Sequence, residues 1–146
     1  DFASTMTLGL VPASPQTIRS ADGNVEVTIG RTGNGHFEAD AKVNGAAIRF
    51  LVDTGASSVV LSFQDAAAAG IDRSTLGFSI PVSTANGTAL AAGTRIDEIT
   101  LGGIVRRNMP ALVAPEGAMA ESLLGMDFLD SLSGYSVEQD RMVLKD

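Results

Sequence analysis

Residues 50–58 read Phe50-Leu51-Val52-Asp53-Thr54-Gly55-Ala56-Ser57-Ser58. An apolar strand ends there in an acid, and a Thr-Gly turn follows directly. Apolar walls and a neighbouring charge shift the pKa of a carboxyl group, so this position suits a catalytic carboxylate. The Asp-Thr-Gly triplet occurs once in the chain. A mechanism that needs two such carboxylates must therefore take the second from another copy of the chain.

The sequence predicts a β-hairpin that leads into Asp53. Residues 36–43 and 46–52 are strand-like runs separated by Asn44-Gly45. Asn-Gly at this spacing is typical of a type I′ turn, in which both central residues have positive φ. The second strand of this hairpin delivers Asp53.

The remaining chain is predicted to form short strands with one or two short helices. The expected strands cover residues 25–29, 59–61, 78–84, 89–101, a short piece at 105, 109–113, 122–125, 135–138 and 141–144. Ser62 is expected to cap a helix over 63–69 that ends at Gly70, and a second short helix is expected over 126–132. A turn at 85–88 joins two of the strands into a second hairpin.

Composition restricts the classes of function. The chain has 146 residues, a net charge of −7, no Trp and one Tyr. These values disfavour nucleic acid and anionic membrane surfaces as partners. No stretch approaches 18 consecutive apolar residues, so no membrane span is expected in this chain. Cysteine is absent, which excludes disulfides and thiolate chemistry but suits any redox compartment.

We expect an N-terminal arm or linker with one strand over residues 1–34, and the main domain over 35–146. Residues 1–20 show no clear periodicity of apolar residues, and they contain Pro12 and Pro15. The chain starts at Asp1 rather than Met, which leaves room for a signal or anchor ahead of it. A periplasmic or membrane-anchored protein would fit such a leader.

Other chemistries have less support in these residues. An Asp-Thr-Gly triplet appears by chance in roughly 3% of chains this long, so Asp53 alone would be read as a turn residue. His36 is the only histidine. It stands at the start of a strand, with no nucleophile motif elsewhere, and is expected at the surface. One histidine and scattered acids give no metal-ligand spacing, so no metal is expected.

Two further motifs, in order along the chain, support a catalytic role for the triplet. Residues 53–57 are followed by the candidate hairpin tip at Asn86-Gly87 and then by Ser122-Leu123-Leu124-Gly125-Met126-Asp127. This combination resembles the retropepsin-like aspartic proteases, single-domain relatives of the pepsins, across residues 36–144. The helix at 63–69 is longer than in viral members and is similar to that of bacterial and cellular relatives.

The resemblance implies an all-β acid protease fold, a partly closed barrel with one or two short helices. It implies an endopeptidase without cofactor, in which an Asp53 pair across a homodimer activates water. Thr54 and Gly55 would support the pair. Peptide or protein substrates would be bound by residues of the loop and of the flap: Ala56, Ser57, Ala85, Asn86, Gly87 and Thr88. Viral relatives often carry Asp where Ser57 stands, so polar recognition there is altered.

Two alternatives stay open at this point. The domain is a peptide-binding or dimerisation module with the same fold and little catalysis, or it is an unrelated β-barrel in which Asp53 is only a turn residue. For the dimer, the strand near Met142-Val143-Leu144 and the N-terminal arm are the expected interface, because they would otherwise be exposed edges.

Overall fold

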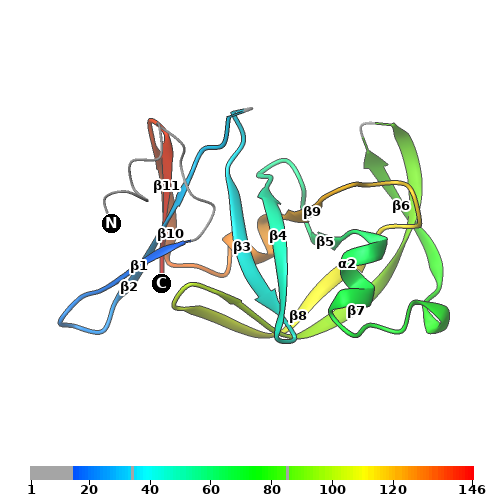
Figure 1. Cartoon of the computed structure of the whole chain (residues 1–146), viewed down its shortest axis with the longest axis horizontal. Coiled ribbons are helices and arrows are strands. Elements are labelled where there is room, and N and C mark those ends of the chain that lie inside the picture. Colours follow the sequence, from blue (N-terminus) through cyan, green and yellow to red (C-terminus); the bar gives the residue numbers. More distant parts are fainter. Residues whose placement is uncertain (1–14, 34, 85) are drawn as a thin grey trace, which may run out of the picture.

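The computed structural model describes residues 15–33, 35–84 and 86–146 as an almost entirely β protein. Its strands form two sheets, one of seven strands and one of four. Figure 1 shows the smaller sheet at one end of the long axis and a long twisted hairpin at the other. The predicted fold class, all-β with short helices, is confirmed.

The larger sheet curls into a partly closed barrel. Its strand order is β3 (Glu38–Val43), β4 (Ala46–Val52), β9 (Ser122–Leu124), β5 (Val59–Leu61), β8 (Ile104–Val113), β7 (Gly87–Leu101) and β6 (Phe78–Thr84). β3 also pairs with β7 through Lys42 opposite Thr100 and Val43 opposite Ile99. That second pairing closes the ring and leaves β6 as the last strand of the sheet.

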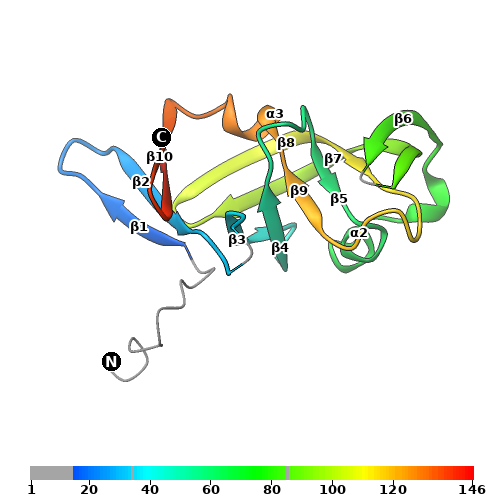
Figure 2. The same cartoon turned by 90° about the horizontal axis from the view of Figure 1, so that it is seen from above.

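The smaller sheet joins the two ends of the described chain. Its order is β1 (Gln16–Arg19), β2 (Val25–Gly30), β11 (Arg141–Lys145) and β10 (Gly134–Glu138). Figure 2 shows the end of the β7–β8 hairpin beside this sheet, with β1 on the outer side of the sheet. β11 lies between β2 and β10, so both of its edges are paired. The expectation that residues 142–144 form an exposed edge is therefore wrong, because β2 covers the side that β10 does not.

The described part of segment 1–34, residues 15–33, contains two strands, where the sequence predicts one in the whole segment. β1 is exposed along its whole length, so it carries no apolar pattern from which it could be predicted. It is held by a ladder with the next strand, β2, and by one contact distant in the chain, in which Gly103 N donates to the Thr17 hydroxyl at 3.1 Å.

Local turn signals in the sequence are confirmed. Asn44 and Gly45 have φ of 52° and 86°, as a type I′ turn requires. Helix α2 (Phe63–Ala68) is capped by the Ser62 hydroxyl, which accepts from Asp65 N. Gly70, with φ of 80°, follows its C-terminus. His36 is exposed, as expected.

Other elements differ from the prediction in length. β8 is one strand of 10 residues instead of two short ones, because the long strand β7 pairs with it throughout. Asn108 has φ of 54° within β8, and its carbonyl accepts from Arg95 Nη1 at 2.8 Å. Helix α3 (Met126–Leu129) ends three residues before the predicted end at 132. A 3-10 helix, η1 (Arg73–Thr75), precedes β6. No helix in the described ranges is long and apolar enough to cross a membrane.

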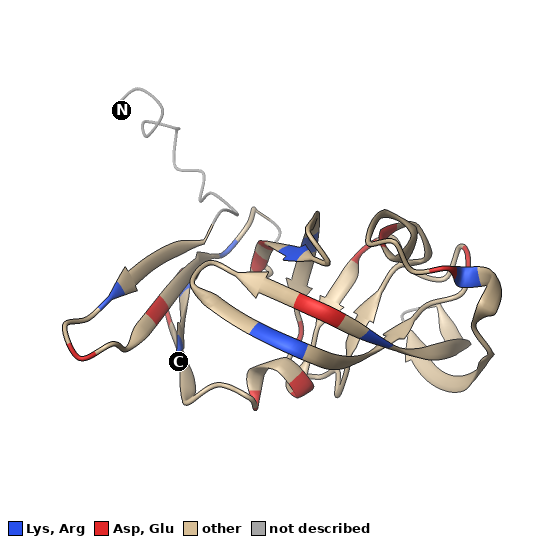
Figure 3. Ribbon diagram, turned by 90° about the horizontal axis from the view of Figure 1, so that it is seen from below, with Lys and Arg blue, Asp and Glu red and all other residues tan. Residues whose placement is uncertain are grey.

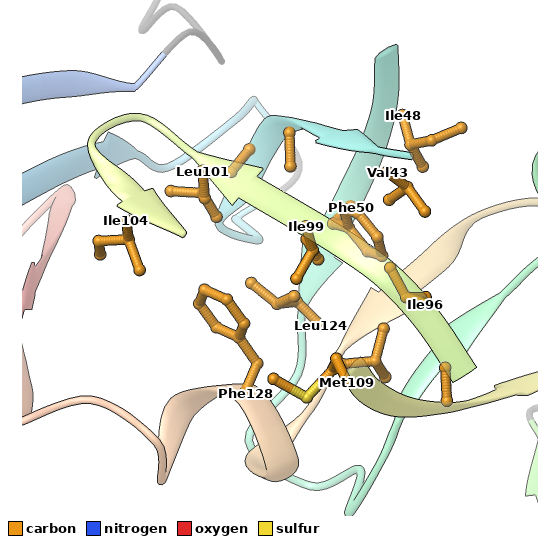
Figure 4. Packing of buried hydrophobic residues seen from close by; sticks show 14 of the residues in the cluster. Val43, Ile48, Phe50, Ile96, Ile99, Leu101, Ile104, Met109, Leu124 and Phe128 are labelled. Carbon is orange, nitrogen blue, oxygen red and sulfur yellow. The ribbon is translucent and has the colours of Figure 1, made fainter. Parts of the chain in front are cut away.

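The core is aliphatic and fills the inside of the barrel. Phe50 of β4, Leu124 of β9 and Phe128 of α3 are completely buried and lie beside Ile99 of β7 (Figure 4). Because Leu124 and Phe128 flank Gly125, the core fixes the position of the segment that passes behind Asp53.

Arg106 ties the smaller sheet to the barrel. Its guanidinium donates to both oxygens of the Asp146 carboxylate, at 2.6 and 3.1 Å. It also donates to the Ser131 carbonyl at 2.9 Å. On the same hairpin, Arg107 pairs with Glu98 at 2.9 Å, and Figure 3 shows these acidic and basic segments side by side. The hydrogen bond from Arg106 lowers the pKa of Asp146, against a smaller rise from burial.

We expect Asp146→Asn to lower the free energy of unfolding by about 1 kcal/mol near pH 7. Because the folded-state pKa of Asp146 is depressed, its contribution is present above the unfolded pKa and is lost as pH falls through the folded pKa. Urea unfolding at about pH 7 and about pH 3 checks this, and the difference from wild type should be smaller at the lower pH. Asp140→Asn, which removes an exposed charge, is the matched control. Equal losses at both pH values would contradict this assignment.

Candidate active site

Two parallel strands place Asp53 at their common end. β4 and β9 pair in parallel, with Leu51 opposite Leu123 and Val52 opposite Leu124. Asp53 follows β4 directly, and its backbone N–H donates to the Leu124 carbonyl at 3.1 Å. The Leu-Leu-Gly segment is therefore in direct contact with the Asp-Thr-Gly turn, although more than 60 residues separate the two in the sequence.

The turn after β4 holds one oxygen of the Asp53 carboxylate. Gly55 N donates to Oδ1 at 2.9 Å, and Ala56 N donates to the Asp53 carbonyl at 3.1 Å. A Cβ on Gly55 would lie 3.2 Å from Oδ1, so the tight turn favours glycine. Within the described ranges Oδ2 receives no hydrogen bond, and Asp53 is partly exposed. One carboxylate oxygen is thus oriented, while the other is available to a ligand.

Gly125 supports the loop from behind. An added Cβ at this residue would lie 2.2 Å from the Ser58 carbonyl oxygen and 2.6 Å from that of Ala56. Met126 N donates to the Ala56 carbonyl at 2.8 Å, and Asp127 N donates to the Ser57 carbonyl at 2.9 Å. This close packing argues against the alternative of an unrelated barrel, which would separate Leu124-Gly125 from Asp53.

A buried hydrogen-bond chain fixes β9 from its other end. The Ser122 hydroxyl accepts from Ser62 N at 3.0 Å and donates to Asp65 Oδ2 at 2.6 Å. Ser122 and Ser62 are both buried, with 0% and 2% of their surfaces exposed. The cap of α2 therefore also anchors the strand that carries the Leu-Leu-Gly segment. The sequence signals the cap, but the partner Ser122 depends on a contact 60 residues away.

A cleft of about 670 Å³ lies over the Asp53 loop. Among the predicted site residues, Asp53, Gly55, Ala56, Ser57 and Asn86 line this cleft. The loop and the tip of the β6–β7 hairpin are thus brought together.

The other predicted site residues lie elsewhere. Thr54 is exposed beside the cleft, and Gly87 and Thr88 stand on the hairpin without lining the cleft. Ala85 lies outside the described residues. The Thr54 hydroxyl forms no hydrogen bond within the described part of the chain, so it is available to a partner outside this copy.

Sequence reasoning missed most of the cleft wall. The wall comes from β4 to β6, from β8 and from the segment before β9: Leu51, Ser58, Val60, Pro81, Val82, Ser83, Thr84, Leu112, Ala118, Met119, Ala120, Glu121 and Leu123. Proximity to the quoted motifs signals Ser58 and Leu123, but nothing local signals Leu112 or Glu121. In the described ranges, no group of three His, Asp or Glu side chains is placed to hold a metal ion.

Relatives of this chain are found in bacteria. The sequence model of a family described as "gag-polyprotein putative aspartyl protease" matches residues 39–131. An uncharacterized protein of a Sinorhizobium species is 42% identical over 145 residues, which cover 99% of this chain and 62% of that protein. An uncharacterized protein of Rickettsia prowazekii is 36% identical over 119 residues, or 82% of this chain and 51% of that protein. The chain thus spans between half and two thirds of these curated relatives.

Solved structures give the same likeness. The crystal structure of a retropepsin-like aspartic protease from Rickettsia conorii superposes with a TM-score of 0.76 at 32% identity, covering 90% of this chain and 94% of that one. EIAV protease, in complex with the inhibitor HBY-793, superposes with a TM-score of 0.56 at 22% identity, covering 69% and 91%. The second comparison concerns the fold alone.

Proposed function

This chain belongs to the retropepsin-like aspartic protease family, and on that basis we propose that it is an aspartic endopeptidase completed by a second copy of itself. The proposal rests on one observation, which is that this chain supplies one of the two carboxylates that such a site needs. A single oriented carboxylate, Asp53, faces a cleft of about 670 Å³ beneath a hairpin.

The proposed chemistry uses the two Asp53 carboxyl groups of the dimer as one acid–base pair. Two carboxylates about 3 Å apart cannot both ionise, so they share one proton. The ionised group takes a proton from a water molecule, and the water oxygen attacks the peptide carbonyl carbon. The protonated group donates its proton to the carbonyl oxygen. When the C–N bond breaks, the protonated group gives its proton to the leaving nitrogen and the ionised group takes a proton from one hydroxyl of the tetrahedral intermediate, so the pair again holds one shared proton. The pKa values of such a pair belong to both groups jointly.

The neighbouring residues have supporting roles in this proposal. The exposed Thr54 hydroxyl would hydrogen-bond across the two loops and set the separation of the carboxylates. Ala56, Ser57 and Asn86 would contact the substrate main chain from opposite sides of the cleft. β6 is the last strand of its sheet and lines the cleft, so an extended peptide could be held beside it as an added strand. The hairpin, with Gly87 and Thr88 near its tip, would act as the flap that excludes water.

Free sheet edges supply the candidate dimer contacts. In the smaller sheet the outer strands are β1 and β10, and the exposed apolar residues Ile18 and Val137 lie on them, 62% and 52% exposed. An isologous pairing through such an edge would cover both the apolar side chains and the unpaired backbone groups. β10 and β1 therefore replace residues 142–144 as the candidate interface strands.

The proposal is tested by cleavage of a peptide library at several protein concentrations. The molecular mass of the protein in solution is measured at the same concentrations. We expect endopeptidase products, and a specific activity that rises with concentration as dimers form. Peptide binding without any cleavage at concentrations where the dimer is fully formed would instead identify a binding module with the same fold.

A further inference from the structure

Glu121 brings a second carboxylate to the cleft. It precedes β9 in the segment that forms one wall, and Asp53 and Glu121 are the only charged residues among the described residues that line the cleft. Its side chain is exposed, and within the described ranges it takes part in no hydrogen bond or ion pair. Asp53 has a role in the chemistry proposed above. Glu121 has no role in that chemistry.

Part of the wall of the same cleft is apolar. Val60 of β5, Leu112 of β8 and Leu123 of β9 line the same cleft, and Val60 stands directly opposite Leu123 in the sheet. A ligand side chain that enters here meets a hydrocarbon surface with a carboxylate near it. Lys and Arg side chains match such a surface, because their methylene stems bury well while the cationic end stays near an anion.

Arg49 interacts with Glu121 through charge, but it is bound to another acid. The pKa of Arg49 is raised chiefly by its hydrogen bond with Asp40, while Glu38 and Glu121 make smaller contributions through their charges. Arg49 Nε lies 2.8 Å from Asp40 Oδ1, and Arg49 Nη1 lies 3.9 Å from Glu38 Oε1. One cation thus interacts with three carboxylates, and its hydrogen bonds are with Asp40 rather than with Glu121. No Lys, Arg or His is among the described cleft residues.

We propose that Glu121 is a specificity-determining residue that selects substrates with Lys or Arg close to the scissile bond. The inference rests on the proposed endopeptidase function and adds the class of side chain that the cleft accepts. In a two-fold dimer the pocket occurs twice, so basic residues would be favoured on both sides of the cleaved bond.

Two peptides that differ only by Lys or Met at one position beside the cleaved bond test the inference. Both residues are unbranched and of similar length, so the comparison isolates the charge. We expect a higher kcat/KM for the Lys peptide, and a Lys-to-Met ratio that falls about fivefold in Glu121→Gln. Glu121→Lys should invert the preference. Glu116→Gln removes an exposed charge from the same loop outside the cleft and should leave the ratio unchanged.

Binding to the Asp53→Asn variant separates this inference from the proposed function. The affinities of the same two peptides can be measured on that variant by fluorescence anisotropy, whether or not cleavage occurs. Tighter binding of the Lys peptide that Glu121→Gln removes supports the specificity, even if no bond is cut. Equal affinities, or a preference that Glu116→Gln reduces as much as Glu121→Gln, would overturn it while leaving the protease function standing.

Discussion

Asp53→Asn should lower kcat/KM for peptide cleavage by at least about a thousandfold, since both acid–base groups of the dimer are lost together. Asn keeps the shape of the side chain, and its amide oxygen can still accept from Gly55 N, a bond of 2.9 Å in the wild type. The turn, the fold and the cleft should therefore persist. The measurement is kcat/KM on a library-derived peptide, with urea unfolding as the check on folding.

Asp127→Asn is the matched control for that variant. Asp127 is an exposed acid in the first turn of α3, close in space to the same loop, but it does not line the cleft. Among the described residues, its one hydrogen bond to the loop comes from its backbone N–H, which Asn retains. We expect cleavage within about twofold of wild type, as for most exposed substitutions. If Asp127→Asn abolished cleavage and Asp53→Asn did not, the catalytic role would belong to Asp127.

Gly125→Ala should have the largest effect on stability. The new Cβ would meet the Ser58 and Ala56 carbonyl oxygens at 2.2 and 2.6 Å, and both belong to the backbone of the Asp53 loop. The Ala56 carbonyl cannot move without straining its hydrogen bond from Met126 N, and Ser58 directly follows Ser57, whose carbonyl accepts from Asp127 N. We expect the free energy of unfolding to fall by more than about 3 kcal/mol, or the protein to fail to fold.

The unfolding midpoint in urea measures this change, and Gly77→Ala serves as its control. An added Cβ at Gly77 has no neighbour within 4 Å, and the backbone there does not have positive φ. That substitution should change stability by no more than about 0.5 kcal/mol. A Gly125→Ala protein as stable as Gly77→Ala would show that the loop can move away from β9.

Elements fixed by local chemistry could be predicted from the sequence. Asn44-Gly45 specifies a type I′ hairpin through its own backbone preferences, and Ser62 with Gly70 sets the ends of α2. The Asp53 turn is equally local. Its partner at Leu123-Leu124-Gly125 was predicted only through the resemblance to a family, because no local rule joins segments so distant in the chain.

Features that depend on distant partners could not be predicted. β1 is exposed and has no apolar pattern, and its position depends on β2 and Gly103. β8 stays continuous past Asn108 because β7 lies beside it. Glu121 reads as an ordinary surface acid, and only the parallel pairing of β4 with β9 brings the segment before β9 to the cleft.

Mixing wild-type chain with the Asp53→Asn chain is the most direct test of the central claim, that each copy supplies half of one active site. The wild-type concentration is held constant while the variant is added and the subunits are allowed to exchange. If two copies share the site, activity should fall to about half at equal amounts and approach zero in excess variant, because mixed dimers carry one carboxylate. Activity that stays constant at every ratio would mean that a single chain is sufficient, and would contradict the shared site.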